Sequence, residues 1–126
     1  MRRAIQTANA PRPIGPYSQG VMKAPFLFTA GQVGIDPKTS QMVPGGVEAE
    51  TRQALLNLQG IIEEAGRSLD DVLKTTVFLI TMDDFKAFNG VYAEFFPAPP
   101  PARTTVAVAG LPAGARVEIE AVVAIE

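Results

Sequence analysis

The spacing of hydrophobic residues changes several times along this chain, and the order of the changes restricts the folds open to it. Between residues 54 and 65, apolar side chains recur at helical spacing opposite polar ones, and Gly66 stands where a helix-terminating glycine belongs. Residues 72–80 are a branched and aromatic run that is typical of a strand. Residues 81–84 then predict a capped helix start, with a buried stripe of Phe85, Phe88, Tyr92 and Phe95 or Phe96 before Pro97 ends the helix.

Short strands are expected on either side of these segments. Residues 2–6, 20–23 and 26–31 predict strands near the amino terminus, and the last two strands are expected to form a hairpin around residues 110–114. The order of strands, helix, strand, helix and two strands predicts a single α+β domain over residues 1–126. In this domain a mixed β-sheet carries two helices packed on one face.

The residue types that are absent limit the chemistry. The sequence has no cysteine and no histidine, which excludes thiol nucleophiles, disulfides, histidine-based triads and most zinc or iron sites, so we expect no metal. A net charge of −2 with scattered Lys and Arg argues against nucleic-acid binding. No apolar run reaches the length of a membrane span, and no secretory signal is evident, so we expect a cytoplasmic protein.

A proline run delivers Arg103 to the start of an apolar strand. A guanidinium at this place suits a small carboxylate ligand, because its planar fork can bind both oxygens. In the expected hairpin, Val106 shares the helix-covered face with the apolar residues of the last strand, whereas Arg103 and Glu118 lie on the other face. That second face is semi-apolar, which predicts that another copy of the chain covers it.

The same hairpin keeps Arg103 and Glu118 apart. If Ala107 lies opposite Glu118, the two are separated by roughly 13 Å along the ladder, too far for one small ligand to touch both easily. Either the register differs, or a site combines Arg103 of one subunit with Glu118 of its neighbour. We favour the second interpretation.

Five short motifs in order resemble one known family nearly end to end. They are IGPYSQG at residues 14–20, TAGQ at 29–32, KTTVFL at 74–79, PAR at 101–103 and VEIEA at 117–121. Together they resemble the Rid (YjgF-type) family of enamine/imine deaminases. The resemblance implies a chorismate-mutase-like fold, a homotrimer with clefts between subunits, and no metal or organic cofactor.

The implied activity is that of a 2-iminobutanoate/2-iminopropanoate deaminase, which hydrolyses reactive 2-enamine and 2-imino acids of the 2-aminoacrylate type to 2-oxo acids and ammonia. By the resemblance, Arg103 holds the substrate carboxylate and Glu118 positions or activates water. The resemblance also implies substrate-binding positions at Tyr17, Gly31, Asn89 and Thr105.

The chain departs from the family pattern at three places. Thr105 stands where several relatives carry cysteine, Ala30 replaces a common serine, and the loop at residues 97–101 looks short. The alternative function is a non-catalytic trimer that binds small carboxylates as a 2-oxo acid or amino acid sensor. Ribonuclease activity, also claimed for the family, is disfavoured by the missing histidine and basic stripe. From pattern alone, Arg103 could instead form an interface ion pair, and Glu118 and Glu120 could be solvated sheet residues.

Overall fold

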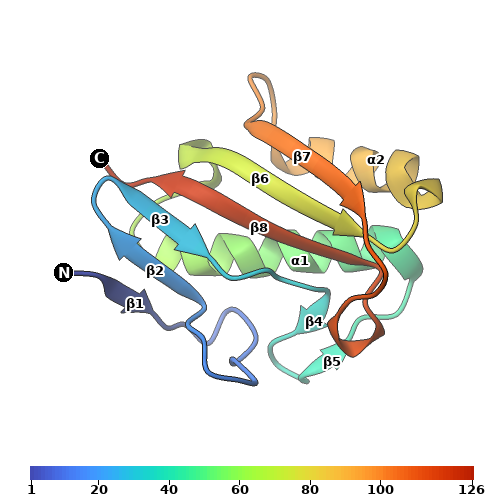
Figure 1. Ribbon diagram of the computed structural model, residues 1–126, viewed down its shortest axis with the longest axis horizontal. Coiled ribbons are helices and arrows are strands. Elements are labelled where there is room, and N and C mark those ends of the chain that lie inside the picture. The colour runs from blue at the N-terminus through green and yellow to red at the C-terminus, as the bar shows by residue number, and fades with distance from the viewer.

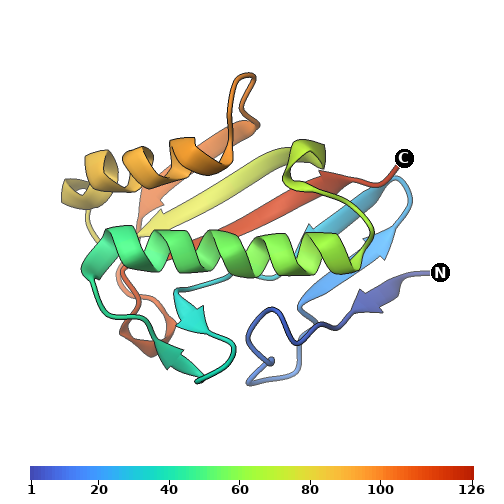
Figure 2. The same ribbon diagram turned by 180° about the vertical axis from the view of Figure 1, so that it is seen from behind.

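The computed structural model describes residues 1–126 as a six-stranded mixed sheet with two helices on one face (Figures 1 and 2). Helices α1 (Gly46–Glu64) and α2 (Phe85–Phe95) form the second layer. In spatial order the sheet consists of β1 (Arg3–Ile5), β2 (Gly20–Lys23), β3 (Phe26–Thr29), β8 (Val117–Ala124), β6 (Val72–Leu79) and β7 (Ala102–Ala107). Strands β4 (Ile35–Asp36) and β5 (Gln41–Met42) pair separately, and single turns of 3-10 helix occupy Leu69–Asp71, Met82–Asp84 and Pro112–Gly114. The predicted α+β architecture is confirmed.

Both predicted helices are present, although α1 begins earlier than its clearest apolar spacing suggested. Its first turns bury Val47 and Thr51 in the same layer as the later apolar positions. Gly66 follows the helix with a φ of 79°, and the backbone N–H of Arg67 donates to the carbonyl of Ile62. This is the glycine-terminated helix end that the sequence predicted.

The predicted hairpin between the last two strands is wrong. Strand β7 pairs in parallel with β6, and β6 separates it from β8 (Figure 1). The apolar strand β6 forms backbone hydrogen bonds with a neighbouring strand along each of its two edges. Helix α2 supplies the crossover connection that a parallel β6–β7 pair requires. The segment between β7 and β8 is long enough to pass the end of β6, so neighbours in sequence do not pair.

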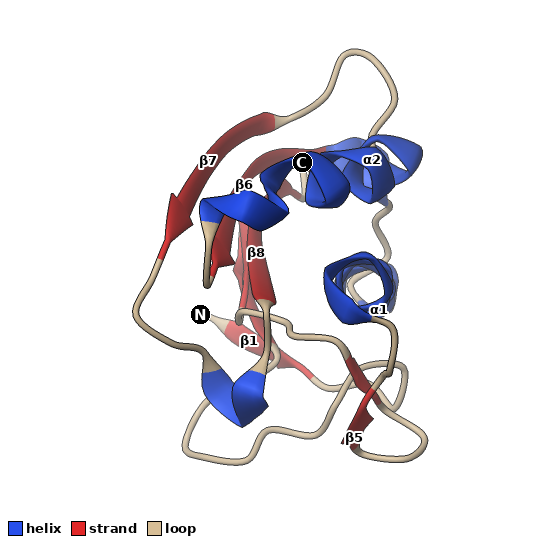
Figure 3. Cartoon of the chain, turned by 90° about the vertical axis from the view of Figure 1, so that its right-hand side faces the viewer, coloured by secondary structure: helices blue, strands red, loops and turns tan.

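The parallel pairing reverses the predicted face of β7. We call the face packed against α1 and α2 the covered face and the other the open face (Figure 3). Arg103 is level with Thr75, and Thr105 with Val77; since Thr75 and Val77 are fully buried, β7 directs Arg103 and Thr105 to the covered face. Val106, predicted to be covered, is 40% exposed on the open face.

The predicted face of β8 is confirmed. Its apolar residues Val117, Ile119, Ala121 and Val123 are buried, whereas Glu118 and Glu120 alternate with them on the open face. The open face also carries large apolar side chains, among them Phe26, Phe28, Phe78, Val106 and Val122. Phe28 is 54% exposed, so this face is as apolar as the sequence predicted.

Candidate functional site

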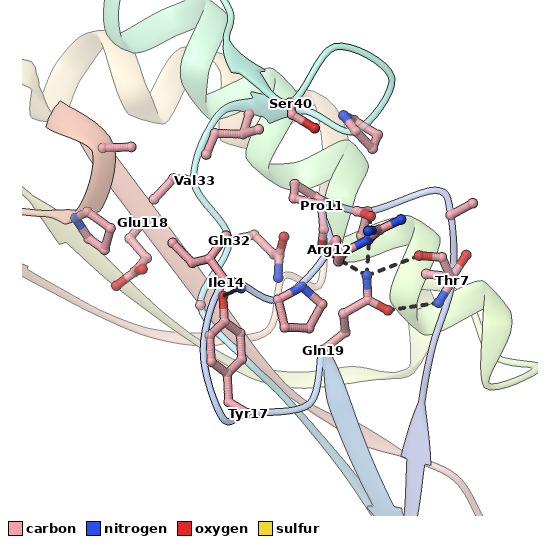
Figure 4. Close-up of a pocket in the computed structure, with 18 of the residues that line it drawn as sticks. Thr7, Pro11, Arg12, Ile14, Tyr17, Gln19, Gln32, Val33, Ser40 and Glu118 are labelled. Carbon is pink, nitrogen blue, oxygen red and sulfur yellow. Dashed lines mark hydrogen bonds between the residues drawn. The ribbon is translucent and has the colours of Figure 1, made fainter.

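A groove of about 880 Å³ lies beside the carboxyl ends of β1 and β3 and the start of β8 (Figure 4). One wall is the proline-rich loop between β1 and β2, and the other is the segment that follows β3. Tyr17, Gly31 and Glu118 all line it. Three of the predicted site residues are therefore brought together in one hollow.

Gly31 lies directly against the Glu118 side chain. The segment after β3 pairs with β8 through two backbone hydrogen bonds between Gln32 and Ile119, of 2.8 and 3.0 Å. A Cβ atom at position 31 would lie 2.7 Å from Cδ of Glu118 and 3.0 Å from its Oε2. Glycine allows this close approach, because any side chain at position 31 would have to displace the carboxylate.

Glu118 is a half-buried carboxylate with no cation beside it. Neither of the two ion pairs in the structure involves it. Burial raises its pKa above the ordinary glutamate value, and the negative charge of Glu120, on the same face of β8, raises it further. A carboxylate tuned in this direction is a better proton acceptor near neutral pH than a solvated one.

Gln19 fixes the loop that carries Tyr17, a role that the sequence analysis missed. Its buried amide nitrogen donates to the carbonyls of Thr7, Ala10 and Pro11, and its oxygen accepts from the N–H of Thr7 (Figure 4). A loop rich in proline has few N–H groups for its own turns, so a side chain must supply the bonds. The sequence signal that could have indicated this role is a glutamine between a proline-rich loop and a strand.

Arg103 belongs to a second, smaller hollow of about 490 Å³, together with Asn89. Its Cζ atom lies 5.6, 5.4 and 4.8 Å from the ring centroids of Phe85, Phe88 and Tyr92 on α2. Rings at this distance attract a guanidinium through cation–π interaction. The three rings of α2 support the guanidinium of Arg103, and the hollow lies beside that guanidinium.

No carboxylate in the chain neutralises Arg103. The two ion pairs join Arg52 to Glu94 and Arg116 to Asp84. A partly buried guanidinium without an anion is costly, so a bound anion would be favoured at this place. The predicted interface ion pair therefore has no counterpart within one chain.

A buried hydrogen bond holds Tyr92 in place. Its hydroxyl and Oγ1 of Thr75 are 2.7 Å apart in the buried layer between α2 and β6. Burial raises the pKa of Tyr92 above its usual value, so the ring stays neutral beneath Arg103. Thr105 lies on the same side of β7, where its buried hydroxyl has no hydrogen-bond partner, but it does not line the hollow.

The six predicted site residues thus form two groups on opposite faces of the sheet. Tyr17, Gly31 and Glu118 form one group, and Arg103, Asn89 and Thr105 form the other. Arg103 is level with Thr75, whose partner on β8 is Ala121, whereas Glu118 lies opposite Phe78. The backbone positions of Arg103 and Glu118 differ by about 10 Å along the strands and about 10 Å across them. The pairing differs from the predicted one, yet one chain still cannot place both side chains on a small ligand.

Comparison with known proteins identifies the family. A family profile described as Endoribonuclease L-PSP matches residues 7–125. The chain belongs to this family, which is the YjgF/Rid family that the motifs resemble. A RutC family protein from Pyrococcus horikoshii is 52% identical over 97% of each chain. The 2-iminobutanoate/2-iminopropanoate deaminase of Dermatophagoides farinae is 46% identical over 99% of this chain and 98% of its own.

Solved structures of family members match the whole fold. A Thermotoga maritima protein has a TM-score of 0.96 at 46% identity, covering 100% of this chain and 99% of its own. The Escherichia coli protein TdcF, solved with bound serine, has a TM-score of 0.94 at 39% identity, covering 98% and 99% of the two chains. Neither helix of the present chain is long and apolar enough to cross a membrane.

Proposed function

We propose that the protein hydrolyses 2-imino and 2-enamine acids to 2-oxo acids and ammonia, at clefts between the subunits of a homotrimer. The observation that carries the proposal is the unpaired guanidinium of Arg103, supported on three aromatic rings beside an open hollow. Relatives that are 46–48% identical bear the name of this deaminase. TdcF, a relative solved with serine, binds a small amino acid.

Arg103 is proposed to hold the substrate carboxylate. The rings of α2 restrict the plane of the guanidinium, so its N–H groups can meet both carboxylate oxygens at once. Asn89 lines the same hollow, and Thr105, two residues further along β7, has a buried hydroxyl without a hydrogen-bond partner on the same side of the strand. Arg103 and Asn89 form the binding half of the proposed cleft, with Thr105 behind them.

Glu118 is proposed to act on water in the other half, with Tyr17 beside it and Gly31 behind it. Water oxygen bonds to C2 of the protonated imine while one water proton passes to the Glu118 carboxylate. The carbinolamine nitrogen takes that proton back and the C2–N bond breaks. The hydroxyl proton leaves with ammonia as ammonium, the C2 carbonyl forms, and Glu118 is regenerated. Every group in this sequence belongs to the protein, the substrate or water.

A neighbouring subunit is proposed to bring the halves together. Arg103 and Glu118 lie on opposite faces of one sheet, so the reaction needs Arg103 from one chain and Glu118 from the next. The apolar open face, with Phe28 and Val106 exposed, supplies a surface whose burial would stabilise the assembly.

Mixing two inactive variants tests the shared cleft. Arg103→Ala and Glu118→Gln each remove one half, so each alone should lose deaminase activity measured as 2-oxo acid release. Coexpressed in equal amounts, random trimers would combine an intact Arg103 with an intact Glu118 in about a quarter of clefts, and that share of activity should return. Mixed trimers with no activity would refute a cleft that is built from two chains.

Binding separates the deaminase from the sensor. Glu118→Gln should still bind a 2-oxo acid, because Arg103 remains, whereas Arg103→Ala should not. If the unaltered protein binds the 2-oxo acid but hydrolyses imines no faster than buffer does, the sensor is the correct interpretation.

A further inference from the structure

The groove beside Glu118 is much larger than a short 2-imino acid requires. Its volume of about 880 Å³ lies in the range that encloses ligands of drug size. A substrate with one or two side-chain carbons would occupy only the end near Glu118. The remaining length runs between the two walls toward Arg12 and Ser40 (Figure 4).

Gln32 presents an amide with no protein hydrogen-bond partner to this remaining length. The residue as a whole is only 5% exposed and lines the groove, no protein group forms a hydrogen bond with its side chain, and its amide atoms keep contact with solvent. The amides of the other two buried residues of this kind, Gln19 and Asn57, donate to backbone carbonyls, and their oxygens accept from Thr7 and Gln53. The N–H groups of Gln32 are therefore available to a ligand in the groove, where a group that accepts from them would take the place of water.

Arg12 lines the wall opposite Gln32 and is the cation of the groove. Arg12 and Glu118 are the two charged side chains that line the groove, and Arg12 forms no ion pair. Its backbone is held between Pro11 and Pro13, and Gln19 binds the carbonyl of Pro11. In Figure 4 the amide end of Gln32 points away from Glu118, toward the side where Arg12 lies.

We propose that Gln32 and Arg12 form a second subsite, which binds the distal carboxylate of a 2-imino diacid such as 2-iminoglutarate. This inference rests on the proposed function, because the imine carbon must lie at Glu118. The amide N–H groups of Gln32 and the guanidinium of Arg12 are all donors, which suits a carboxylate. Glu118 repels the same carboxylate, so the two charges orient the diacid along the groove.

The test compares two substrates of equal carbon number. 2-Iminoglutarate and 2-iminopentanoate are generated in situ from glutamate and norvaline by amino acid oxidases, and kcat/KM is measured by competition with semicarbazide, which traps unreacted imine. Arg12→Gln should lower kcat/KM for 2-iminoglutarate about tenfold and leave 2-iminopentanoate within about twofold, since charge-assisted hydrogen bonds are lost only with the diacid. Lys38→Gln removes a nearby exposed cation that does not line the groove, and should change neither.

Gln32→Leu supplies the second variant. It should show the same selective loss for the diacid, while its melting temperature stays about the same, because the amide that is removed forms no hydrogen bond within the protein and leucine is of similar size. Equal losses for both substrates in Arg12→Gln and Gln32→Leu would overturn the subsite, as would unchanged kinetics in both.

Affinity for products distinguishes the failure of this subsite from failure of the proposed function. Titration calorimetry with 2-oxoglutarate and 2-oxopentanoate reports the subsite even if no imine is hydrolysed. Tighter binding of 2-oxoglutarate that depends on Arg12 would support the subsite, whereas equal affinities that Arg12→Gln leaves unchanged would refute it. Absence of turnover with either imine would refute the deaminase alone.

Discussion

Gly31→Ala offers the sharpest test of the position of Glu118. The new Cβ atom would lie 2.7 Å from Cδ of Glu118, where ordinary contact begins at 3.4 Å, so the carboxyl must retreat by about 0.7 Å or more. Displacements of about 1 Å can cost about 10²-fold in rate. We therefore expect kcat/KM to fall about 10- to 100-fold.

The same substitution should leave the fold intact. Gly31 is not among the glycines with positive φ, so alanine can adopt its backbone conformation, and the atom it meets is the end of a flexible side chain. At such positions alanine stabilises by about 0.4–1 kcal/mol through the unfolded state, which offsets the local crowding.

The assay pairs imine hydrolysis with urea unfolding of the same samples. Gly110→Ala is the matched control, because nothing lies within 4 Å of its added Cβ and its φ is not positive, so both readouts should remain unchanged. Full activity in Gly31→Ala would show that the contact with Glu118 does not matter for catalysis. A loss of stability that parallels the loss of activity would make Gly31 architectural instead.

Two further predictions concern titration and the support of Arg103. Burial and then Glu120 raise the pKa of Glu118, and only its deprotonated form accepts a proton, so kcat/KM should rise with pH through a value above the ordinary glutamate range. Glu120→Gln removes one cause, so this limb of the pH profile should move to lower pH; an unmoved limb contradicts the assignment. Tyr92→Phe deprives the buried hydroxyl of Thr75 of its partner and should cost about 1–3 kcal/mol in urea unfolding, while 2-oxo acid affinity at Arg103 changes little because the ring remains. Unchanged stability would show that this hydrogen bond contributes nothing net.

The elements of the fold could be predicted because each depends on local spacing. The helical stripe of α2, the glycine end of α1 and the buried face of β8 all follow from residues a few positions apart. Strand partners do not follow from local spacing. Both β7 and β8 fit the apolar edges of β6, and only the packing of α2 on the covered face decides that β7 runs parallel to it.

The motifs indicated the candidate site residues, but not the residues that support them. Gln19 and Gln32 look like ordinary polar residues in the sequence. Nothing in their spacing shows that the amide of Gln19 is hydrogen-bonded within the protein and that of Gln32 is not. Of the three rings beside Arg103, Phe88 and Tyr92 are buried as predicted and Phe85 is partly buried, and the reversed face of β7 gives all three contact with the guanidinium as well. Such roles arise from pairing across the sheet rather than from sequence neighbours.

In the proposed mechanism, the division of the candidate site between two faces links activity to association. Because β7 lies at an edge and directs Arg103 to the covered face, the guanidinium cannot turn to the open face of its own sheet without losing its aromatic support. Glu118 is held near the start of β8, against Gly31, and cannot cross either. Under the proposed function, catalysis by this pair would therefore require a second chain. A charge that disrupts the apolar open face, such as Phe28→Asp, would then act at a distance from both side chains and still abolish the proposed turnover by separating them.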